Sequence, residues 1–461
     1  MNTNEFDYTF SFGPIQNQNT QVLMFNHLEE KNEYFSISIN DKDLSINGLS
    51  TVPSVSSDLI DLAIAIHAVD RLIKRRKDTS LSFRIELPIR NFDAFIKNNV
   101  CEILTRILEW YTNDCWYFEF SKRNVSGRNV EVQSQLPWRS LPSNNIEAAL
   151  WSGGLDSLAG LNTRLLTNPD SYHILIGTGS NAYIHTKQRR IANEINQLFL
   201  NRTTLIQIPY RWSNTPSSEK SFGQRSRGFV FMLIGAACAY HIGCSSLYIY
   251  ENGVGAINLP YSKAEVGLDH AKSVHPLSLP KVSELVSTIL ETPFQFTNPY
   301  WLKTKAQMVE SLIDTNATNL ILLSSSCDRA RRLEKGITQC GSCPSCLLRR
   351  QSLIALNFDD STIYENNGRI RKDNSHLRAM QHQVNKIRKL LKHSDPWMSL
   401  SEEYHEIDDI VDQISNQNKE KANFLRRQII QLYSNYVDEW NVFEEYIEQK
   451  TLSTTDTYIL S

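Results

Sequence analysis

A glycine-rich turn at 152–157 has the residue types that bind polyphosphate. Its sequence, Ser-Gly-Gly-Leu-Asp-Ser, directly follows an apolar segment that predicts a strand and opens a segment that predicts a helix. Glycine has no Cβ, so the backbone amides of Gly153 and Gly154 could close around phosphate oxygens, and the hydroxyls of Ser152 and Ser157 could add hydrogen bonds. Asp156 would repel a bare phosphate, and we expect it to hold Mg²⁺ or to orient the turn. The alternative is an ordinary serine-glycine turn.

Four of the eight cysteines form a second group with chemical potential. Cys340, Cys343 and Cys346 lie within seven residues, and twelve residues separate Cys327 from Cys340. Four thiolates suit a closed tetrahedral Zn²⁺ site, and metal binding would hold together an otherwise weakly fixed connection. The spacing therefore predicts a structural zinc, with an iron–sulfur cluster or a redox dithiol as alternatives.

Strands and helices alternate through residues 146–358, which predicts right-handed βαβ units and a parallel sheet covered on both faces. Ligands of such a sheet bind beyond the carboxyl ends of the strands, where the glycine-rich turn falls. The expected strands are 148–151, 173–177, 204–208, 247–250 and 319–323, and the expected helices are 187–199, 228–241, 304–315 and one that ends at 166.

The flanking regions have different patterns. Residues 1–143 predict an α+β domain with strands at 34–39, 81–87 and 116–120 and helices after Pro53 and over 95–111, followed by a linker at 133–145. Residues 365–461 predict a helical extension with helices at 376–391, 400–415 and 422–447. The basic residues early in this extension indicate either a solvated helix face or a patch for a charged partner.

Composition and charge narrow the class of protein. The chain has 461 residues, 41% of them hydrophobic, and a net charge of -2, so it is neither collagenous nor low in complexity. No global positive field draws it to nucleic acid or to an anionic membrane, and we expect neither as a partner. The first residues lack a basic segment followed by an apolar one, which predicts a cytoplasmic protein. Polar residues interrupt the uncharged stretch 228–250, which predicts a buried helix followed by a strand.

The turn at 152–157 resembles the SGGxDS motif of the PP-loop ATP pyrophosphatases, which have an adenine nucleotide alpha hydrolase-like fold and cleave ATP to AMP and pyrophosphate. No Walker-type GxxxxGK[ST] loop occurs in the sequence, which argues against γ-phosphate transfer. Together with 304–309, the Ser326-Cys327 pair and CGSCPSCLLR, the turn closely resembles the 7-cyano-7-deazaguanine synthase (QueC) family over residues 146–358. The doubly wound PP-loop domain is thus expected there, with ATP, Mg²⁺ and Zn²⁺ as cofactors.

This resemblance implies roles for individual residues. Residues 152–157, Leu155 included, would bind the pyrophosphate of ATP, Lys305 would contact phosphate, and the four cysteines would hold zinc. We take Asp156 and Lys305 as the catalytic pair, although Lys305 alone could equally be a solvated helix lysine. Arg227, before the buried helix, is a further candidate for phosphate binding and could instead be a helix-entry residue.

The substrate-binding segment departs from the synthase pattern. Here the chain has Glu251 and Asn252 followed by GVGAINLP, in place of the family's stretch that meets the base. Glu251, at the end of a predicted strand, could accept the N1 and N2 hydrogens of a guanine-like edge, with Asn252 beside it, or could be a surface acid. No role is assigned to Asn298.

The whole architecture resembles the QueC-like proteins of bacterial antiviral operons of the Qat type. The resemblance implies an ATP-dependent ligase that forms a carbon–nitrogen bond by adenylating a 7-deazaguanine carboxylate and transferring it to an amine. A partner protein from the same operon would supply that amine, and a homodimer is one expected assembly. The alternatives are nitrile synthesis with ammonia, a PP-loop tRNA sulfurtransferase in which Cys343 and Cys346 carry sulfur, and a non-catalytic defence scaffold.

Overall fold

The computed structural model describes residues 6–14, 19–46, 51–73, 79–124, 127–132, 145–212, 225–261, 272–315, 317–328, 337–365 and 370–455. By its internal contacts the chain forms two compact units that are interleaved along the sequence. The first comprises Met1–Ser152, Asp170–Ile249 and Ala271–Thr297, and the second comprises Gly153–Pro169, Tyr250–His270 and Asn298–Ser461.

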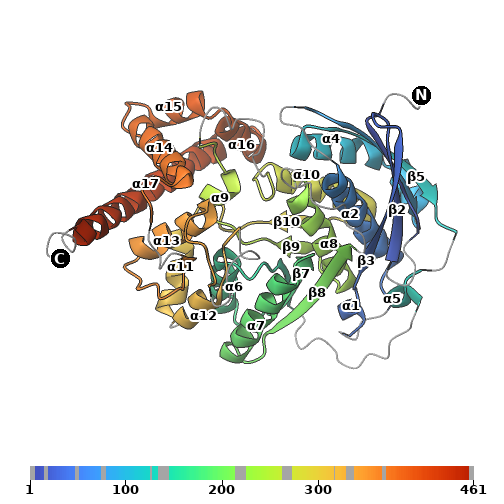
Figure 1. Cartoon of the computed structure of the whole chain (residues 1–461), viewed down its shortest axis with the longest axis horizontal. Coiled ribbons are helices and arrows are strands. Elements are labelled where there is room, and N and C mark those ends of the chain that lie inside the picture. Colours follow the sequence, from blue (N-terminus) through green and yellow to red (C-terminus); the bar gives the residue numbers. More distant parts are fainter. Residues whose placement is uncertain are drawn as a thin grey trace. The chain divides into compact units, whose positions relative to one another are not determined.

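The first unit is built on a ten-stranded sheet in the order β10-β9-β6-β7-β8-β3-β2-β1-β4-β5 (Figure 1). The strands are β1 (Tyr8–Phe12), β2 (Asn19–Asn26), β3 (Lys31–Ile39), β4 (Ser82–Ile89), β5 (Cys115–Lys122), β6 (Ile146–Leu150), β7 (Tyr172–Gly179), β8 (Thr203–Trp212), β9 (Ser246–Tyr248) and β10 (Gln295–Thr297).

The half of the sheet from β10 to β8 is parallel, and its central strands are buried. In β7 every residue after Tyr172 is buried, as expected of a strand with packing partners on both faces. The last residues of β8 then pair antiparallel with β3, with Ile37 opposite Trp212 and Ile39 opposite Tyr210. This pairing joins the N-terminal strands to the parallel half in one continuous sheet.

The N-terminal strands alternate buried and half-buried residues, which is the pattern of a sheet with one face on the core. β1 to β3 form an antiparallel meander; β4 pairs in parallel with β1, and β5 pairs in parallel with β4. Against them packs α2 (Ser54–Leu72), which is buried over most of its length and lies beside α8 (Arg227–His241) (Figure 1). The other helices of this unit are α1 (Asp43–Ile46), α3 (Phe92–Lys97), α4 (Val100–Thr112), α5 (Asn129–Val132), α7 (Ala182–Leu198) and α10 (Ser278–Leu290).

The second unit is helical. It contains α6 (Leu155–Thr167), α9 (Gly253–Ile257), α11 (Lys305–Asp314), α12 (Thr318–Leu323), α13 (Pro344–Ala355), α14 (Ser375–Leu390), α15 (Pro396–Glu403), α16 (Glu406–Ser415) and α17 (Lys419–Thr455). The long helix α17 packs against α13, and α14, α15 and α16 lie along it (Figure 1). Its inner face is aromatic, since Tyr433, Tyr436, Trp440 and Phe443 are fully buried.

The predicted α/β architecture with a mostly parallel sheet is confirmed, and so is the buried helix followed by a strand at 228–250. Three predicted elements are wrong. The apolar run 319–323 is the helix α12, because a short apolar run fits either element. The helix expected at 95–111 breaks at Asn99, whose φ is +54°, into α3 and α4, and the one expected at 400–415 divides into α15 and α16.

The division into domains at 1–143, 146–358 and 365–461 stays a prediction. The two compact units are defined by internal contacts, and they cross these boundaries. Residues 133–144 of the predicted linker lie outside the described residues. Among the helices that the structure describes, none combines the length and apolar character needed to span a membrane.

Candidate functional site

The turn that precedes α6 has the backbone conformation that its glycines suggest. Gly153 has φ +71°, in the left-handed region that favours glycine, and Gly154 is the extended residue that caps α6. The Ser157 hydroxyl donates to the Gly154 carbonyl at 3.0 Å, and the amide of Ser325 donates to the Gly153 carbonyl at 3.2 Å. The N-terminal end of a 13-residue helix thus starts at a turn fixed from both sides, which is an arrangement that suits an anion.

Four polar side chains from three segments of the chain meet at the start of α6. The Lys305 ammonium forms an ion pair with Asp156 Oδ2. Asn252 Nδ2 donates to Glu251 Oε1 at 2.8 Å and lies 3.3 Å from Asp156 Oδ1. Lys305 is only 5% exposed and Asn252 is fully buried, so this group of Asp156, Glu251, Asn252 and Lys305, called here the acidic cluster, is largely shielded from water.

Helix caps and one asparagine fix the members of the acidic cluster. Lys305 is the first residue of α11, whose N-cap Thr304 forms a capping box with Gln307. Asn252 caps α9 by accepting from the Gly255 amide at 2.9 Å. Asn298 holds the backbone of Glu251, because its Nδ2 donates to the Glu251 carbonyl at 2.9 Å. No role for Asn298 is predicted from the sequence, and in the structure its side chain supports the backbone of the cluster.

Glu251 has a raised pKa in the acidic cluster. Its pKa is raised to about 8: burial is the largest cause, the neighbouring Asp156 carboxylate also raises the pKa, and the Lys305 ammonium opposes both. The protonated form of Glu251 is therefore favoured at neutral pH. The charges of Asp156 and Lys305 then balance, and Glu251 offers a carboxyl group that can both donate and accept a hydrogen bond.

Glu439 is a contact of this region that the sequence did not reveal. It lies on α17, and its carboxylate accepts hydrogen bonds from the Thr304 hydroxyl and, at 2.9 Å, from Gln351 Nε2. Burial raises the pKa of Glu439 to about 7, while its two hydrogen bonds act in the opposite direction. No local pattern could have identified it, since it lies 135 positions after Thr304 in the chain.

The structure brings the four cysteines together. Their sulfur atoms all lie within 4.8 Å of one another, and the sulfurs of Cys340 and Cys346 are 3.9 Å apart. Amides of the loop point at sulfur, from Cys340 to Cys327 and from Cys343 to Cys340, each at 3.4 Å. With zinc–sulfur bonds of about 2.3 Å, a tetrahedral site places its sulfurs about 3.8 Å apart. The described cysteines therefore fit one metal ion.

A [4Fe-4S] cluster needs a wider arrangement. Each of its thiolate ligands binds a different iron, so the ligand sulfurs are spread by the size of the cluster itself. The four sulfurs here, all within 4.8 Å of one another, are nearer to the spacing of the ligands of one ion. This geometry favours a single bound ion such as Zn²⁺ over an iron–sulfur cluster.

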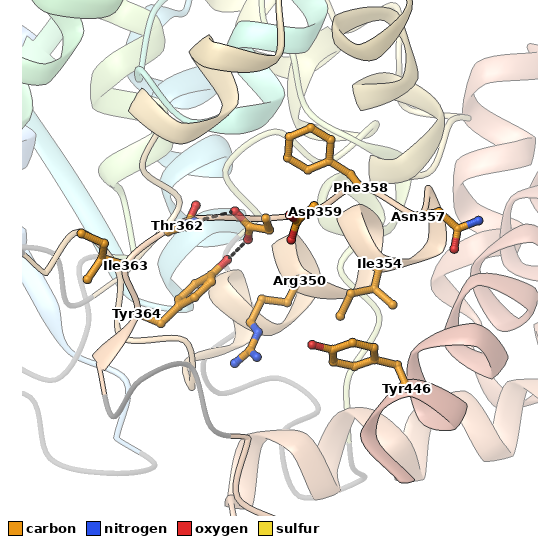
Figure 2. Close-up of a pocket in the computed structure, with 10 residues that line it drawn as sticks. Arg350, Ile354, Asn357, Phe358, Asp359, Thr362, Ile363, Tyr364 and Tyr446 are labelled. Carbon is orange, nitrogen blue, oxygen red and sulfur yellow. Dashed lines mark hydrogen bonds between the residues drawn. The ribbon is translucent and has the colours of Figure 1, made fainter. Parts of the chain in front are cut away.

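The loop of the cysteines is supported by residues that also line a cavity of about 570 Å³ (Figure 2). Arg350 donates to the Gly341 carbonyl at 3.4 Å and its guanidinium lies over the Tyr364 ring, whose hydroxyl donates to Asp360. Gly341 has φ +70°, which this tight loop requires. The cavity is lined by Arg350, Ile354, Asn357, Phe358, Asp359, Asp360, Thr362, Ile363, Tyr364 and Tyr446, and none of these is a site residue predicted from the sequence.

The remaining candidates are placed as follows. Leu155 is buried in the first turn of α6, and Ser152 is exposed. Arg227 belongs to the first unit, where it is exposed at the start of α8 with its guanidinium 5.1 Å from the Phe231 ring. Its role in nucleotide binding stays a prediction.

The basic residues of α14 are in part neutralised by acids. Lys386 pairs with Glu403, and Arg388 pairs with Glu444 at 2.9 Å. Just before the helix, Arg371 pairs with Asp373 at 2.6 Å. These pairs favour the solvated-face interpretation of this segment over a patch for a charged partner.

No protein-family model matches the chain, and no curated protein matches it. One solved structure that the chain is similar to is the U34-tRNA thiolase NcsA from Methanococcus maripaludis with its [4Fe-4S] cluster. The sequence identity is 18%, the TM-score is 0.21, and the match covers 45% of this chain and 81% of that chain.

Proposed function

We propose that this protein is a PP-loop ATP-using ligase that binds MgATP at the turn before α6. The observation that carries the proposal is the left-handed Gly153 at the start of α6, with the Asp156–Lys305 ion pair directly beside it. The helix end and the turn amides would hold the pyrophosphate portion of ATP, and Lys305 would contact phosphate. Asp156 would hold Mg²⁺, which neutralises phosphate charge when bound.

The proposed reaction is the adenylation of a carboxylate followed by attack of an amine. A carboxylate is a poor electrophile, and linking it to AMP creates a good leaving group while pyrophosphate departs. The helix end, the turn amides and Lys305 would stabilise the negative charge that develops on pyrophosphate. The products are then an amide, AMP and pyrophosphate.

The proposed substrate is 7-carboxy-7-deazaguanine, as the QueC resemblance implies. Glu251 supports this choice, because its raised pKa keeps a neutral carboxyl group in the acidic cluster. In place of accepting both the N1 and N2 hydrogens, as expected of a carboxylate, a neutral carboxyl can accept from the N1 hydrogen of a guanine-like edge and donate to the O6 oxygen, so one residue would recognise both groups. The amine acceptor would be a partner protein encoded in the same operon, and ammonia, giving the nitrile, is the alternative acceptor.

The proposed metal at Cys327, Cys340, Cys343 and Cys346 is a structural zinc. Four buried or partly buried thiolates close a tetrahedral site completely and leave no position for a reacting group. In this role the ion would stabilise the loop before α13.

Pyrophosphate release tests the function. Wild-type protein with MgATP and 7-carboxy-7-deazaguanine should release pyrophosphate, and Asp156→Asn should lower the rate by about 100-fold or more, as for loss of a group that stabilises the transition state. Asp314→Asn is the matched control, because Asp314 is exposed at the far end of α11 and should leave the rate unchanged. Intact mass spectrometry of co-expressed operon proteins would identify the acceptor. A wild-type protein that neither binds ATP nor releases pyrophosphate would refute the proposal.

A further inference from the structure

One carboxylate connects the C-terminal helix to the helix that carries Lys305. Glu439, on α17, uses both oxygens: Oε1 accepts from the hydroxyl of Thr304, and Oε2 accepts from Gln351 Nε2. Thr304 is the N-cap of α11 and immediately precedes Lys305. Gln351 lies on α13, the helix that begins at the cysteine loop. Glu439 therefore joins three helices at one point.

The hydrogen bond from Thr304 to Glu439 orients the Thr304 hydroxyl, which caps α11. The Thr304 hydroxyl has a single hydrogen, which goes to Glu439, so its lone pairs are directed elsewhere. One of them accepts the Gln307 amide at 3.2 Å, and the Gln307 side chain returns the bond by accepting from the Thr304 amide at 2.9 Å. Without Glu439 the hydroxyl would be free to rotate away from the cap, which would loosen the first turn of α11.

α17 also approaches the acidic cluster at a second point. Gly253, the residue after Asn252, lies so close to α17 that an added Cβ would be 2.7 Å from Leu432 Cδ2 and 2.3 Å from the Trp301 carbonyl oxygen. The same long helix therefore contacts the residues that start α9 and α11. These are the helix starts next to which Asn252, Glu251 and Lys305 lie.

We infer that Glu439 is a positioning residue that fixes the N-terminal turn of α11 and so holds the Lys305 ammonium against Asp156. The inference rests on the proposed function, in which Lys305 contacts phosphate. The carboxylate is needed for both contacts, because a glutamine at this position would accept from Thr304 but could not also accept from Gln351 with its amide nitrogen. The C-terminal helical region would thus support the reaction from outside the site.

The test compares Glu439→Ala and Glu439→Gln with Asp438→Ala, an exposed neighbour on α17. Two quantities are measured: pyrophosphate release with varied MgATP, and hydrogen exchange of the backbone amides of residues 305–308. For Glu439→Ala we expect kcat to fall about tenfold or more with KM for ATP changed less than about threefold, since misplacing a group mainly affects the reaction step. The amides of residues 305–308 should exchange faster.

Glu439→Gln should recover part of the loss, because it keeps one acceptor, and Asp438→Ala should match wild type. If Glu439→Ala does not fold, Glu439→Gln is used in its place. Its kcat should then be lower than that of Asp438→Ala but still measurable. Exchange and kcat of Glu439→Ala equal to those of Asp438→Ala would overturn the inference. A wild-type protein without pyrophosphate release would refute the proposed function alone, and the exchange measurement would still decide whether Glu439 fixes α11.

Discussion

Replacing Lys305 with methionine should destabilise the protein in a way that depends on pH. The substitution keeps most of the side-chain volume and removes the ammonium that pairs with Asp156. Lys305 is 5% exposed and the Asp156 side chain is 13% exposed, so the pair is largely buried. Removing one partner of a buried pair leaves an uncompensated charge, and we expect a loss of about 3 kcal/mol in the free energy of unfolding.

The pH dependence follows from Glu251. The pKa of Glu251 is raised to about 8 in the folded protein. Protonated Glu251 therefore contributes stability that is fully present below its pKa in the unfolded chain and is lost as the pH rises from that pKa through 8. Lys305 lowers this pKa, and without the ammonium the folded pKa of Glu251 rises further. Above pH 8 the wild type has finished losing this contribution while Lys305→Met continues to lose about 1.4 kcal/mol per pH unit. The difference in the free energy of unfolding between wild type and Lys305→Met should therefore widen by about 1 kcal/mol between pH 8 and pH 9.

Urea unfolding followed by tryptophan fluorescence at pH 6, 8 and 9 measures this difference. Lys303→Met is the matched control, because Lys303 is exposed two residues earlier in the chain. Adding Asp156→Asn to Lys305→Met should recover part of the stability, since the double variant has no lone carboxylate. The reasoning would be refuted if Lys305→Met were as stable as Lys303→Met, or if the gap stayed constant above pH 8.

Three further predictions concern the metal and two glycines. Purified protein should hold about one zinc per chain by elemental analysis, unaffected by reductant, and Cys346→Ser should lose it whereas Cys115→Ser, at an exposed cysteine, should not. Gly153→Ala should weaken ATP binding in calorimetry and cost about 1–2 kcal/mol of unfolding free energy, because alanine is strained at φ +71°. Gly253→Ala should lower the thermal midpoint through a loss of about 1–3 kcal/mol, since its Cβ would clash with backbone at 2.3 Å, whereas Gly13→Ala, whose Cβ meets nothing closer than 3.6 Å, should not.

The features that sequence predicted best are those encoded locally. The glycine turn at 152–157 and the three cysteines at 340–346 place their groups within one short segment, so their chemistry is visible before the fold is known. The strands of the parallel half were also predictable, because residues buried on both faces give continuous apolar runs such as that of β7.

Features that depend on pairing between distant segments could not be predicted from the sequence. The antiparallel contact of β3 with β8 joins residues 37–39 to residues 210–212, and neither segment shows in its own sequence which partner it takes. Glu439 is one of many acids on an amphipathic helix, and only the fold separates it from its neighbours. The acidity of Glu251 has the same origin, since burial and Asp156 cause it and neither is a property of residues 250–252 alone.

The charge balance of the acidic cluster explains why nucleotide binding there would require a cation. When Glu251 is protonated, Asp156 and Lys305 form a neutral pair. The Lys305 ammonium is then bound to the Asp156 carboxylate. For Lys305 to contact phosphate, Asp156 must exchange its positive partner for another, because two anions side by side in a shielded site repel each other strongly. Mg²⁺ bound with ATP would supply that positive charge to Asp156. The same ion pair that stabilises the free protein would thus make productive binding of ATP depend on magnesium.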